Sequence, residues 1–420
     1  MESYIRKLEK DEISSFVEIV INAYPGTTRN TAEFKQQYIE SLVSIQEKIN
    51  TVHFYGLFRK GKLVGGMRIH HFTMNVHGNL VEAGGVGLVA VDLLHKKEKA
   101  AKNLIDYFIS YFKEKGTSIV MLYPFRPDFY KKMGFGYGTK MNQYQIEPAS
   151  FPMADTKEGL VYLDSTYKEQ IKKCANRYAC LTHGMILKTD YELEVMFKNP
   201  DHKLVGFMED GELNGYIVFT FKNVNNDNFL MNNLIIKEFI YETPRALTRL
   251  SSFLSTQADQ VNRVILNTQD DDIEFLISES RNGSHHLIPS VYHETKTSGI
   301  GLMYKIIDVP KFLLQLPTEH FSEKTCQLGL IVKDSFHSDE PQKWLISYRK
   351  GMLTVDEYVL NRTDIELEVD ISDLSSMAMG AVSVDKLYQY GRLNINKPED
   401  LAGIKRLFAH SQKPICTTAF

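Results

Sequence analysis

Apolar and polar positions over residues 81–137 predict a strand, a helix and a second strand in succession. The run Val86–Val91 is largely apolar and follows a Gly84-Gly85 pair, which is typical of a short buried strand that starts after a break. Gly116 ends the helix, and Ile119–Leu122 is predicted as the next buried strand. The helix carries one apolar stripe at helical spacing: Ala101, Leu104, Ile105, Phe108 and Phe112.

Two helices and three antiparallel strands are predicted ahead of this unit. Apolar residues recur at helical spacing over residues 13–21 and again over residues 31–48. Lys60-Gly61 separates two apolar runs and is a hairpin signal. The expected strands cover residues 53–59, 62–71 and 72–77.

An internal repeat predicts that this fold occurs twice. Phe54–Gly65 aligns without gaps to Leu204–Gly215, and the two segments are a domain length apart rather than a solenoid period apart. Leu234–Ile236 is then the counterpart of the strand before the helix, and Leu247–Leu254 is part of the counterpart helix. The chain should therefore contain a duplicated domain.

Four basic residues surround the start of the first predicted helix: His95, Lys96, Lys97 and Lys99. Unpaired backbone N–H groups and the helix dipole favour an anion at that end of a helix. Lysine opposes the dipole unless an anion is bound, so a phosphate site is one interpretation. A solvated helix end is the other, and the turn alone leaves both open.

The stretch resembles motif A of the GNAT N-acetyltransferases, and more closely their enhanced-intracellular-survival (Eis) branch. Val89-Ala90-Val91 matches the strand of the motif, His95-Lys96-Lys97 its basic run and Ala101 its final small residue. Leu93 stands where proline is usual and Lys99 where glycine is usual, although a lysine side chain can also reach a phosphate. The resemblance implies acetyl-coenzyme A (acetyl-CoA) as cosubstrate, held by Leu88, Val89, Ala90, Val91, Lys96, Lys97, Lys99, Ala100 and Ala101.

Tyr123-Pro124-Phe125 and Asp128–Gly136 extend the resemblance. Tyr130 stands where the family has a tyrosine, which implies a general acid that protonates the departing CoA thiolate. A phenol of pKa about 10 can protonate a thiolate whose conjugate acid has a pKa of about 8.5 only when it is well positioned. The alternative for Tyr130 is a packing aromatic beside Phe129 and Phe135.

The order of elements resembles tandem GNAT (acyl-CoA N-acyltransferase) folds of the α+β and α/β type, followed by a sterol-carrier-protein-like α+β domain. The expected domains are a catalytic GNAT domain over residues 1–150, a degenerate GNAT-like domain over 151–297 and the sterol-carrier-protein-like domain over 298–420. The second copy has Ile240–Pro244 in place of the basic turn, with Glu242 where phosphate would lie. A carboxylate there repels phosphate, so one donor site per chain is expected.

The last expected domain contains no polar constellation of its own, and a structural role is favoured over lipid binding. Its methionines at 377 and 379 more often indicate core packing than a lipid slot. The Eis resemblance implies that the C-terminus returns to the first domain, where the α-carboxylate of Phe420 serves as general base or as the electrostatic partner of the amine. The alternative is a hydrophobic tail that only packs.

Composition and charge narrow the class of protein. Hydrophobic residues make up 43% of the chain, charged residues 24%, and the net charge of −3 gives no reason to expect a nucleic acid or an anionic membrane as partner. The 4 cysteines lack metal-ligand spacing, so we expect reduced thiols and no metal. Neither a membrane-spanning stretch nor a signal-peptide core is evident, and the expected location is the cytoplasm.

The predicted function is transfer of an acetyl group from acetyl-CoA to a primary amine by direct attack, without a covalent enzyme intermediate. By resemblance, the acceptor is an aminoglycoside-like amine, a polyamine or a lysine, and the assembly is a homo-oligomer, a hexamer. Glu82 and Asp92 are candidates for acidic residues near the acceptor. The alternative is a catalytically degenerate GNAT scaffold that binds a ligand or a protein.

Overall fold

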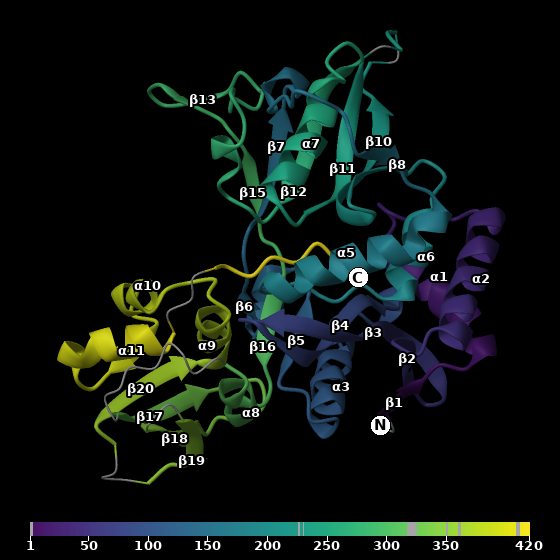
Figure 1. Ribbon diagram of the computed structural model, residues 1–420. Coiled ribbons are helices and arrows are strands. Elements are labelled where there is room, and N and C mark those ends of the chain that lie inside the picture. The colour runs from purple at the N-terminus through teal and green to yellow at the C-terminus, as the bar shows by residue number, and fades with distance from the viewer. Residues whose placement is uncertain are drawn as a thin grey trace.

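The computed structural model describes residues 3–225, 227–229, 231–316, 326–349, 352–359, 363–408 and 412–420. Two seven-stranded sheets and one five-stranded sheet organise these residues (Figure 1). A ribbon of β13 (Leu287–Ile288) and β14 (Tyr292–His293) projects beside the second sheet. Within the described ranges, none of the helices is long and apolar enough to cross a membrane.

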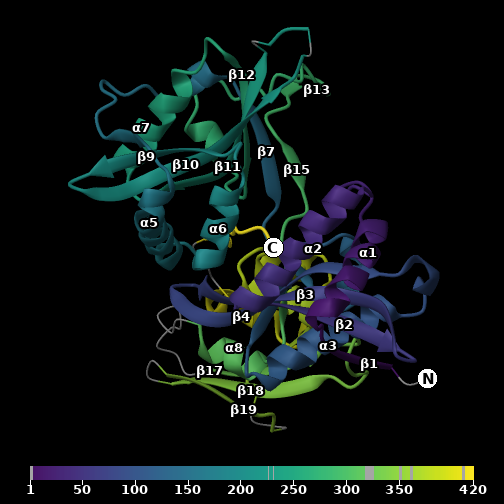
Figure 2. The same cartoon turned by 90° about the vertical axis from the view of Figure 1, so that its right-hand side faces the viewer.

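The first sheet has the strand order β1-β2-β3-β4-β5-β16-β6. Helix α3 packs its apolar stripe against one face, and α1 and α2 cover the other (Figure 2). The strands are β1 (Ser3–Lys7), β2 (Val52–Arg59), β3 (Lys62–Val76), β4 (Asn79–Val91), β5 (Ile119–Leu122), β16 (Met303–Ile306) and β6 (Gly136–Tyr137). The helices are α1 (Ile13–Ala23), α2 (Ala32–Lys48), α3 (Ala100–Glu114) and α4 (Pro127–Lys131).

Two expectations about β3 and β4 are wrong. The predicted strands over residues 62–71 and 72–77 form the single strand β3, whose hairpin partner is β4. The Gly84-Gly85 pair does not interrupt β4, because both glycines pair with His71 and His70 in the antiparallel ladder. Glycine in a strand interior can mark the close approach of another group instead of a break.

The second sheet repeats the first, as the internal repeat predicts. Its strand order is β8-β9-β10-β11-β12-β7-β15. Both hairpin turns use left-handed residues, Lys60-Gly61 (φ 50° and 73°) in the first copy and Asp210-Gly211 (φ 53° and 81°) in the second. The strands are β8 (Leu160–Tyr162), β9 (Lys203–Glu209), β10 (Glu212–Asn223), β11 (Asn232–Tyr241), β12 (Val261–Thr268), β7 (Met141–Ile146) and β15 (Thr297–Gly299). The helices are α5 (Lys168–Leu181), α6 (Asp190–Lys198) and α7 (Pro244–Ser255).

Each of the two seven-stranded sheets includes a strand from beyond the expected domain boundary. β7 lies before residue 150 in the sequence but pairs with β12 in the second sheet. β16 lies after residue 297 but pairs with β5 and β6 in the first sheet. The sheets therefore do not end at residues 150 and 297, because each is completed by a strand from beyond its own segment.

The third sheet shares a hydrophobic core with the first. Its strands follow the order β19-β18-β17-β20-β21, and α9 packs on β16 and β6. Met377 and Met379 are fully buried in this core, which confirms the core interpretation. The strands are β17 (Cys326–Lys333), β18 (Gln342–Arg349), β19 (Met352–Glu357), β20 (Ile365–Asp370) and β21 (Leu393–Ile395). The helices are α8 (Val309–Leu314), α9 (Ile371–Ala378), α10 (Val384–Gln389) and α11 (Leu401–Leu407).

Candidate active site

The strands β4 and β5 separate at the centre of the first sheet. Their parallel pairing extends from Ala83 opposite Ile119 to Val86 opposite Leu122, whereas β4 continues to Val91. Leu88 has a positive φ of 52°, and the register with β3 shifts next to it, so β4 bulges where the pairing with β5 stops. This bulge leaves a backbone edge of β4 open to an extended ligand.

A basic cavity of about 480 Å³ lies at the turn between β4 and α3. Lys97 and Lys99 both adopt left-handed backbone conformations, with φ of 66° and 63°, and Lys99 is the N-cap residue of α3. Lys99 therefore takes the conformation that glycine would supply, and the turn keeps its shape despite the substitution. The lining residues are Val91, His95, Lys96, Lys97, Lys99, Ala100, Ala101, Lys102, Phe129, Lys132, Met133 and Phe336.

Acidic charge close to this turn is already neutralised. The carboxylate of Glu98 lies 2.5 Å from Arg59 Nη1 and 3.0 Å from His95 Nδ1. The lysines of the turn are exposed and are free to meet an anionic ligand at the α3 N-terminus. Of the predicted strand residues, only Val91 lines this cavity, while Leu88, Val89 and Ala90 form the bulge behind it.

We predict that Lys99→Gly weakens acetyl-CoA binding by about fivefold, since an exposed ionic contact of about 1 kcal/mol is lost. The same change should raise the free energy of unfolding by about 0.5–1 kcal/mol, because it relieves a left-handed side-chain conformation. Calorimetric titration and urea unfolding measure the two effects. Lys60→Gly is the matched control: Lys60 also has a positive φ, but it lies in a hairpin turn outside the cavity. Tighter acetyl-CoA binding by Lys99→Gly would contradict the prediction.

Phe336 is a lining residue that sequence reasoning missed. It follows β17 in the third domain, and its ring centroid lies 5.1 Å from Lys102 Nζ and 5.2 Å from Lys305 Nζ. Lys305 is fully buried, forms a 2.7 Å ion pair with Asp334 and donates to Met133 O at 2.9 Å. No local sequence signal could have found Phe336, because the entry of β16 into the first sheet brings it to the turn.

Tyr130 lies on α4, next to the residues that line the basic cavity. Its ring is 7% exposed and packs edge-on against Phe129 and Phe135, with centroid distances of 5.3 and 6.1 Å. Its hydroxyl makes no hydrogen bond to any residue that the structure describes. Burial raises the pKa of Tyr130 above its ordinary value, and nearby Tyr24 adds to the increase. The hydroxyl of Tyr24 donates to Val89 O on the bulge at 2.7 Å.

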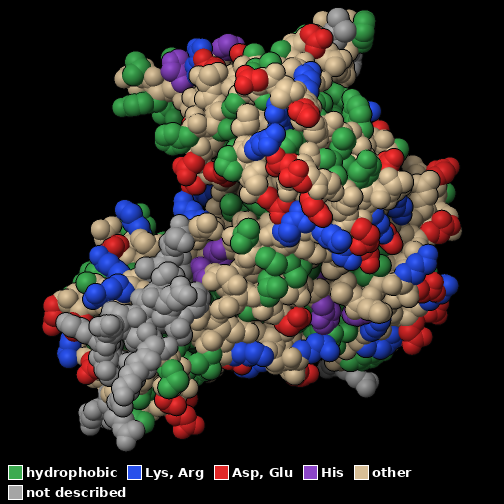
Figure 3. Space-filling model, viewed as in Figure 1, with side chains coloured by type: hydrophobic (Ala, Val, Ile, Leu, Met, Phe, Trp, Pro, Cys, Tyr) green, Lys and Arg blue, Asp and Glu red, His purple; other side chains and the backbone are tan. Residues whose placement is uncertain are grey.

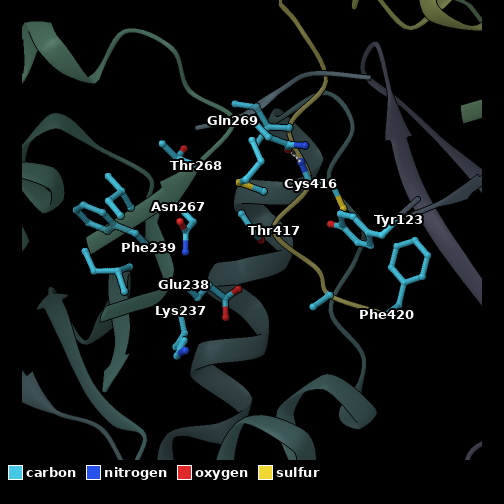
Figure 4. A pocket seen from close by; sticks show the side chains of 15 residues that line it. Tyr123, Lys237, Glu238, Phe239, Asn267, Thr268, Gln269, Cys416, Thr417 and Phe420 are labelled. Carbon is cyan, nitrogen blue, oxygen red and sulfur yellow. Dashed lines mark hydrogen bonds between the residues drawn. The ribbon is translucent and has the colours of Figure 1, made fainter. Parts of the chain in front are cut away.

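The C-terminal tail passes between the two GNAT-like sheets and returns to the first one (Figures 1 and 4). Ile415 N donates to His183 O at 2.8 Å, and Cys416 N donates to Gln269 Oε1. Tyr123 Oη donates to Thr418 O at 2.9 Å. The ring of Phe420 packs against three aromatic rings at centroid distances of 5.0, 5.1 and 5.5 Å: Phe72, Tyr123 and His70.

Glycines at alternate positions of β4 make room for the chain terminus. A Cβ atom added at Gly85 would clash with the Phe72 ring and lie 3.0 Å from the Phe420 ring, and one added at Gly87 would lie 3.0 Å from the Phe420 carboxyl carbon. Because residues two apart share a face of a strand, the two glycines leave one face of β4 without side chains at these positions, and Phe420 lies against this face. The docking of Phe420 was not predicted from this spacing, although the spacing is a signal that could have indicated it.

Replacing Gly87 by alanine should displace the Phe420 carboxyl and lower the rate of acetyl transfer by at least about tenfold, while acetyl-CoA binding stays unchanged. The added Cβ would press on the terminal carboxyl group, which has to move. Steady-state thiol release and calorimetric titration test this. Gly26→Ala serves as the control, since no atom lies within 4 Å of a Cβ added there. Equal rates in the two variants would contradict the assigned position of the terminus.

A second cavity of about 460 Å³ is lined by residues of both GNAT-like domains and of the C-terminal tail. The first sheet contributes Arg68, and the tail contributes the residues Thr417–Phe420. Its remaining lining residues come from the second domain: Lys188, Tyr191, Glu192, Val195, Met196, His202, Val218, Lys237 and Glu238. Neither Glu82 nor Asp92 lines this cavity: Glu82 is exposed, and Asp92 accepts from Leu94 N at 2.8 Å.

The second domain has the same strand separation without the basic turn. Pairing between β11 and β12 ends at Ile236 opposite Leu266, and a cavity of about 470 Å³ there is lined partly by the tail (Figure 4). Glu242 precedes α7 and forms a 2.7 Å ion pair with Arg177 of α5. In this copy, the tail lines the cavity at the strand separation, and an ion pair lies where the first copy has its basic turn.

A strand separation next to a basic helix start, in a duplicated α+β domain, is the arrangement of tandem GNAT acetyltransferases. Residues 4–138 and 184–295 each match a family described as an acetyltransferase (GNAT) domain, and residues 309–417 match one described as a sterol carrier protein domain. The chain is thus a GNAT-family, acetyl-CoA-dependent acetyltransferase with a C-terminal sterol-carrier-protein-like domain. The predicted fold class, tandem GNAT domains and enzyme class are confirmed.

Solved structures share the whole fold. A GCN5-related N-acetyltransferase from Anabaena variabilis aligns with a TM-score of 0.81 at 18% identity, and Eis1 from Mycobacterium abscessus with 0.76 at 16%. A probable N-acyltransferase from Enterococcus faecalis aligns with 0.79 at 19%. Each alignment covers 100% of both chains. A search of curated proteins gave no significant match. At these identities the likeness establishes the fold and leaves the acceptor open.

Proposed function

We propose that the chain transfers the acetyl group of acetyl-CoA to a primary amine by direct attack, at one donor site per chain. The observation that carries this proposal is the position of the chain terminus. Val91 of β4 lines the basic cavity, while Gly87 of the same strand contacts the Phe420 carboxyl beside the second cavity. A donor in the first cavity and an acceptor in the second would therefore meet at the bulge between these two residues.

Each part of the transfer has a candidate group. The bulge from Leu88 to Val91 would orient and polarise the thioester carbonyl, and the turn from Lys96 to Ala101 would hold the phosphates. The amine nitrogen would form the new C–N bond as the C–S bond breaks. The Phe420 carboxylate would take the amine proton, and Tyr130 would give its proton to the thiolate.

The surroundings of Phe420 support its role as a base. An ordinary α-carboxyl has a pKa of about 3.5 and is a weak base in water. The ring of Phe420 packs among the rings of Phe72, Tyr123 and His70, and its carboxyl group lies next to Gly87 of β4. This packing would hold the carboxylate in a fixed position close to the reacting amine.

A thiol-release assay with a panel of primary amines tests the proposal, and the panel should include an aminoglycoside, a polyamine and lysine. We expect turnover with at least one of these amines and none in a Lys96→Glu/Lys97→Glu variant, in which the turn would repel phosphate. Binding of acetyl-CoA without turnover on any amine would favour the degenerate scaffold. The hexamer and the cytoplasmic location stay predictions, and sedimentation velocity measures the first of them.

A further inference from the structure

Arg68 lines the second cavity, the proposed acceptor site, and its charge has no ion-pair partner among the described residues. The residue is half-buried on β3, and its Nε atom is buried without a hydrogen-bond partner. No hydrogen bond or ion pair joins its guanidinium to any residue that the structure describes. Withdrawing a guanidinium from water is costly unless a carboxylate or phosphate compensates for the lost hydration. The position therefore suits an anion that arrives with the ligand.

The acidic side chains of the same cavity are already engaged. Glu238 forms a 2.9 Å ion pair with Lys188, and the side chains of both are about one-tenth exposed, at 10% and 11%. Glu192 accepts from Thr189 N at 2.7 Å in the capping box of α6. Lys188 therefore balances the charge of Glu238, whereas Glu192 is hydrogen-bonded through Oε2 and has no ion-pair partner among the described residues.

The charges left over do not favour a polycation. Among the described residues that line the cavity, exposed Lys237 and half-buried Arg68 are cations without an ion pair, and the Phe420 carboxylate and Glu192 are anions without one, so these charges balance. His70, which touches Phe420, adds no charge near neutral pH, because burial holds its pKa well below the usual range. Figure 3 shows a similar mixture of both signs over the central part of the viewed surface.

Arg68 and the chain terminus flank the same point of β4. Arg68 pairs with Gly87 across the ladder, and a Cβ placed on Gly87 would lie 3.5 Å from Arg68 Nη2 and 3.0 Å from the Phe420 carboxyl carbon. An amine held at the Phe420 carboxylate thus places its neighbouring substituents within reach of the guanidinium. An arginine there can bind a carboxylate through two parallel hydrogen bonds.

We propose that the natural acceptor is an amino-acid-like compound, a primary amine whose carboxylate lies a few bonds away and binds Arg68. The inference rests on the proposed acetyl transfer and narrows its acceptor from amines in general to those that carry a carboxylate. A polyamine or an aminoglycoside leaves Arg68 unpaired and brings further positive charge beside it.

The test compares amino acids with the amines formed by their decarboxylation, using lysine against 1,5-diaminopentane and phenylalanine against 2-phenylethylamine. Thiol release gives kcat/KM for each compound in the wild type and in Arg68→Met, Arg68→Lys and Lys237→Met. We expect the wild type to favour each amino acid by at least about tenfold, as a charge-assisted hydrogen bond would give. This ratio should fall to about one in Arg68→Met, stay above one in Arg68→Lys and change little in Lys237→Met.

The outcomes separate the two proposals. A wild-type preference for the decarboxylated amines would overturn the carboxylate proposal. Equal losses on both members of each pair in Arg68→Met would assign Arg68 to the Phe420 carboxylate instead of the acceptor. Turnover only with amines that carry no carboxylate would also overturn the carboxylate proposal, but it would support the proposed acetyl transfer. Absence of acetyl-CoA binding would remove the proposed function, and the carboxylate proposal with it. Thermal unfolding of each variant shows whether it is folded.

Discussion

Deletion of Phe420 is expected to lower kcat by about 10²–10⁴-fold, the range of a lost general base, while acetyl-CoA affinity stays unchanged. Removing one residue draws the terminal carboxylate back by about 3.5 Å and takes away the ring that packs on Phe72 and Tyr123. The tail remains anchored through Ile415 and Cys416, so the rest of the site should be preserved. Single-turnover thiol release measures the chemical step directly.

Two further variants separate the carboxylate from the ring. Phe420→Leu keeps the terminal carboxylate in place and should lose much less activity than the deletion. One glycine added after Phe420 keeps the ring but turns its carboxyl into an amide, and it should be nearly as impaired as the deletion. A deletion variant that retains half or more of the wild-type rate would show that the terminus only packs.

Tyr130→Phe is the second change with a large expected effect, a loss of about 10²–10⁴-fold in kcat. The substitution removes only the hydroxyl, which makes no protein hydrogen bond within the described residues, so folding and acetyl-CoA affinity should be unaffected. Tyr24→Phe is the matched control, because Tyr24 also lies near the bulge but donates to Val89 O. We expect Tyr24→Phe to retain most of the activity. The reverse order of the two losses would transfer the role of general acid to Tyr24.

The pH dependence gives an independent test of the same group. A general acid must be protonated to act, and burial raises the pKa of Tyr130 above its ordinary value of about 10. Its proton is therefore retained throughout the range in which the amine acceptor loses its own proton. We expect kcat to rise with pH as the amine deprotonates and to show no alkaline decline below about pH 10. A decline centred near pH 8 or 9 would contradict this assignment.

The basic turn before α3 could be predicted from the local sequence, because its residues are contiguous. Lys96, Lys97 and Lys99 precede α3 directly, so the basic helix start could be predicted before its cavity was seen. The internal repeat likewise predicted the second sheet, since both hairpins need the same left-handed turn. The approach of Phe420 to the first domain came only from family resemblance.

The rest of the site depends on contacts between distant segments. Arg68 is an ordinary strand residue in the sequence. It can be recognised as a candidate binding residue only in the folded chain, where the tail and α6 line the same cavity. Phe336 reaches the turn because β16 crosses into the first sheet. Gly85 and Gly87 did carry a signal, their spacing of two on one strand face, but the adjacent Gly84 suggested a break instead. The pattern of apolar and polar residues reveals the periodicity within one helix or strand. It does not reveal which residues of another element will contact it.

The stoichiometry of acetyl-CoA binding tests the central claim most directly. Calorimetric titration of the full chain should give one acetyl-CoA per chain with micromolar affinity, and the Lys96→Glu/Lys97→Glu variant should lose it. This result would place the single donor site at the basic turn of the first domain. Two molecules per chain, or binding that survives the double charge reversal, would contradict the account.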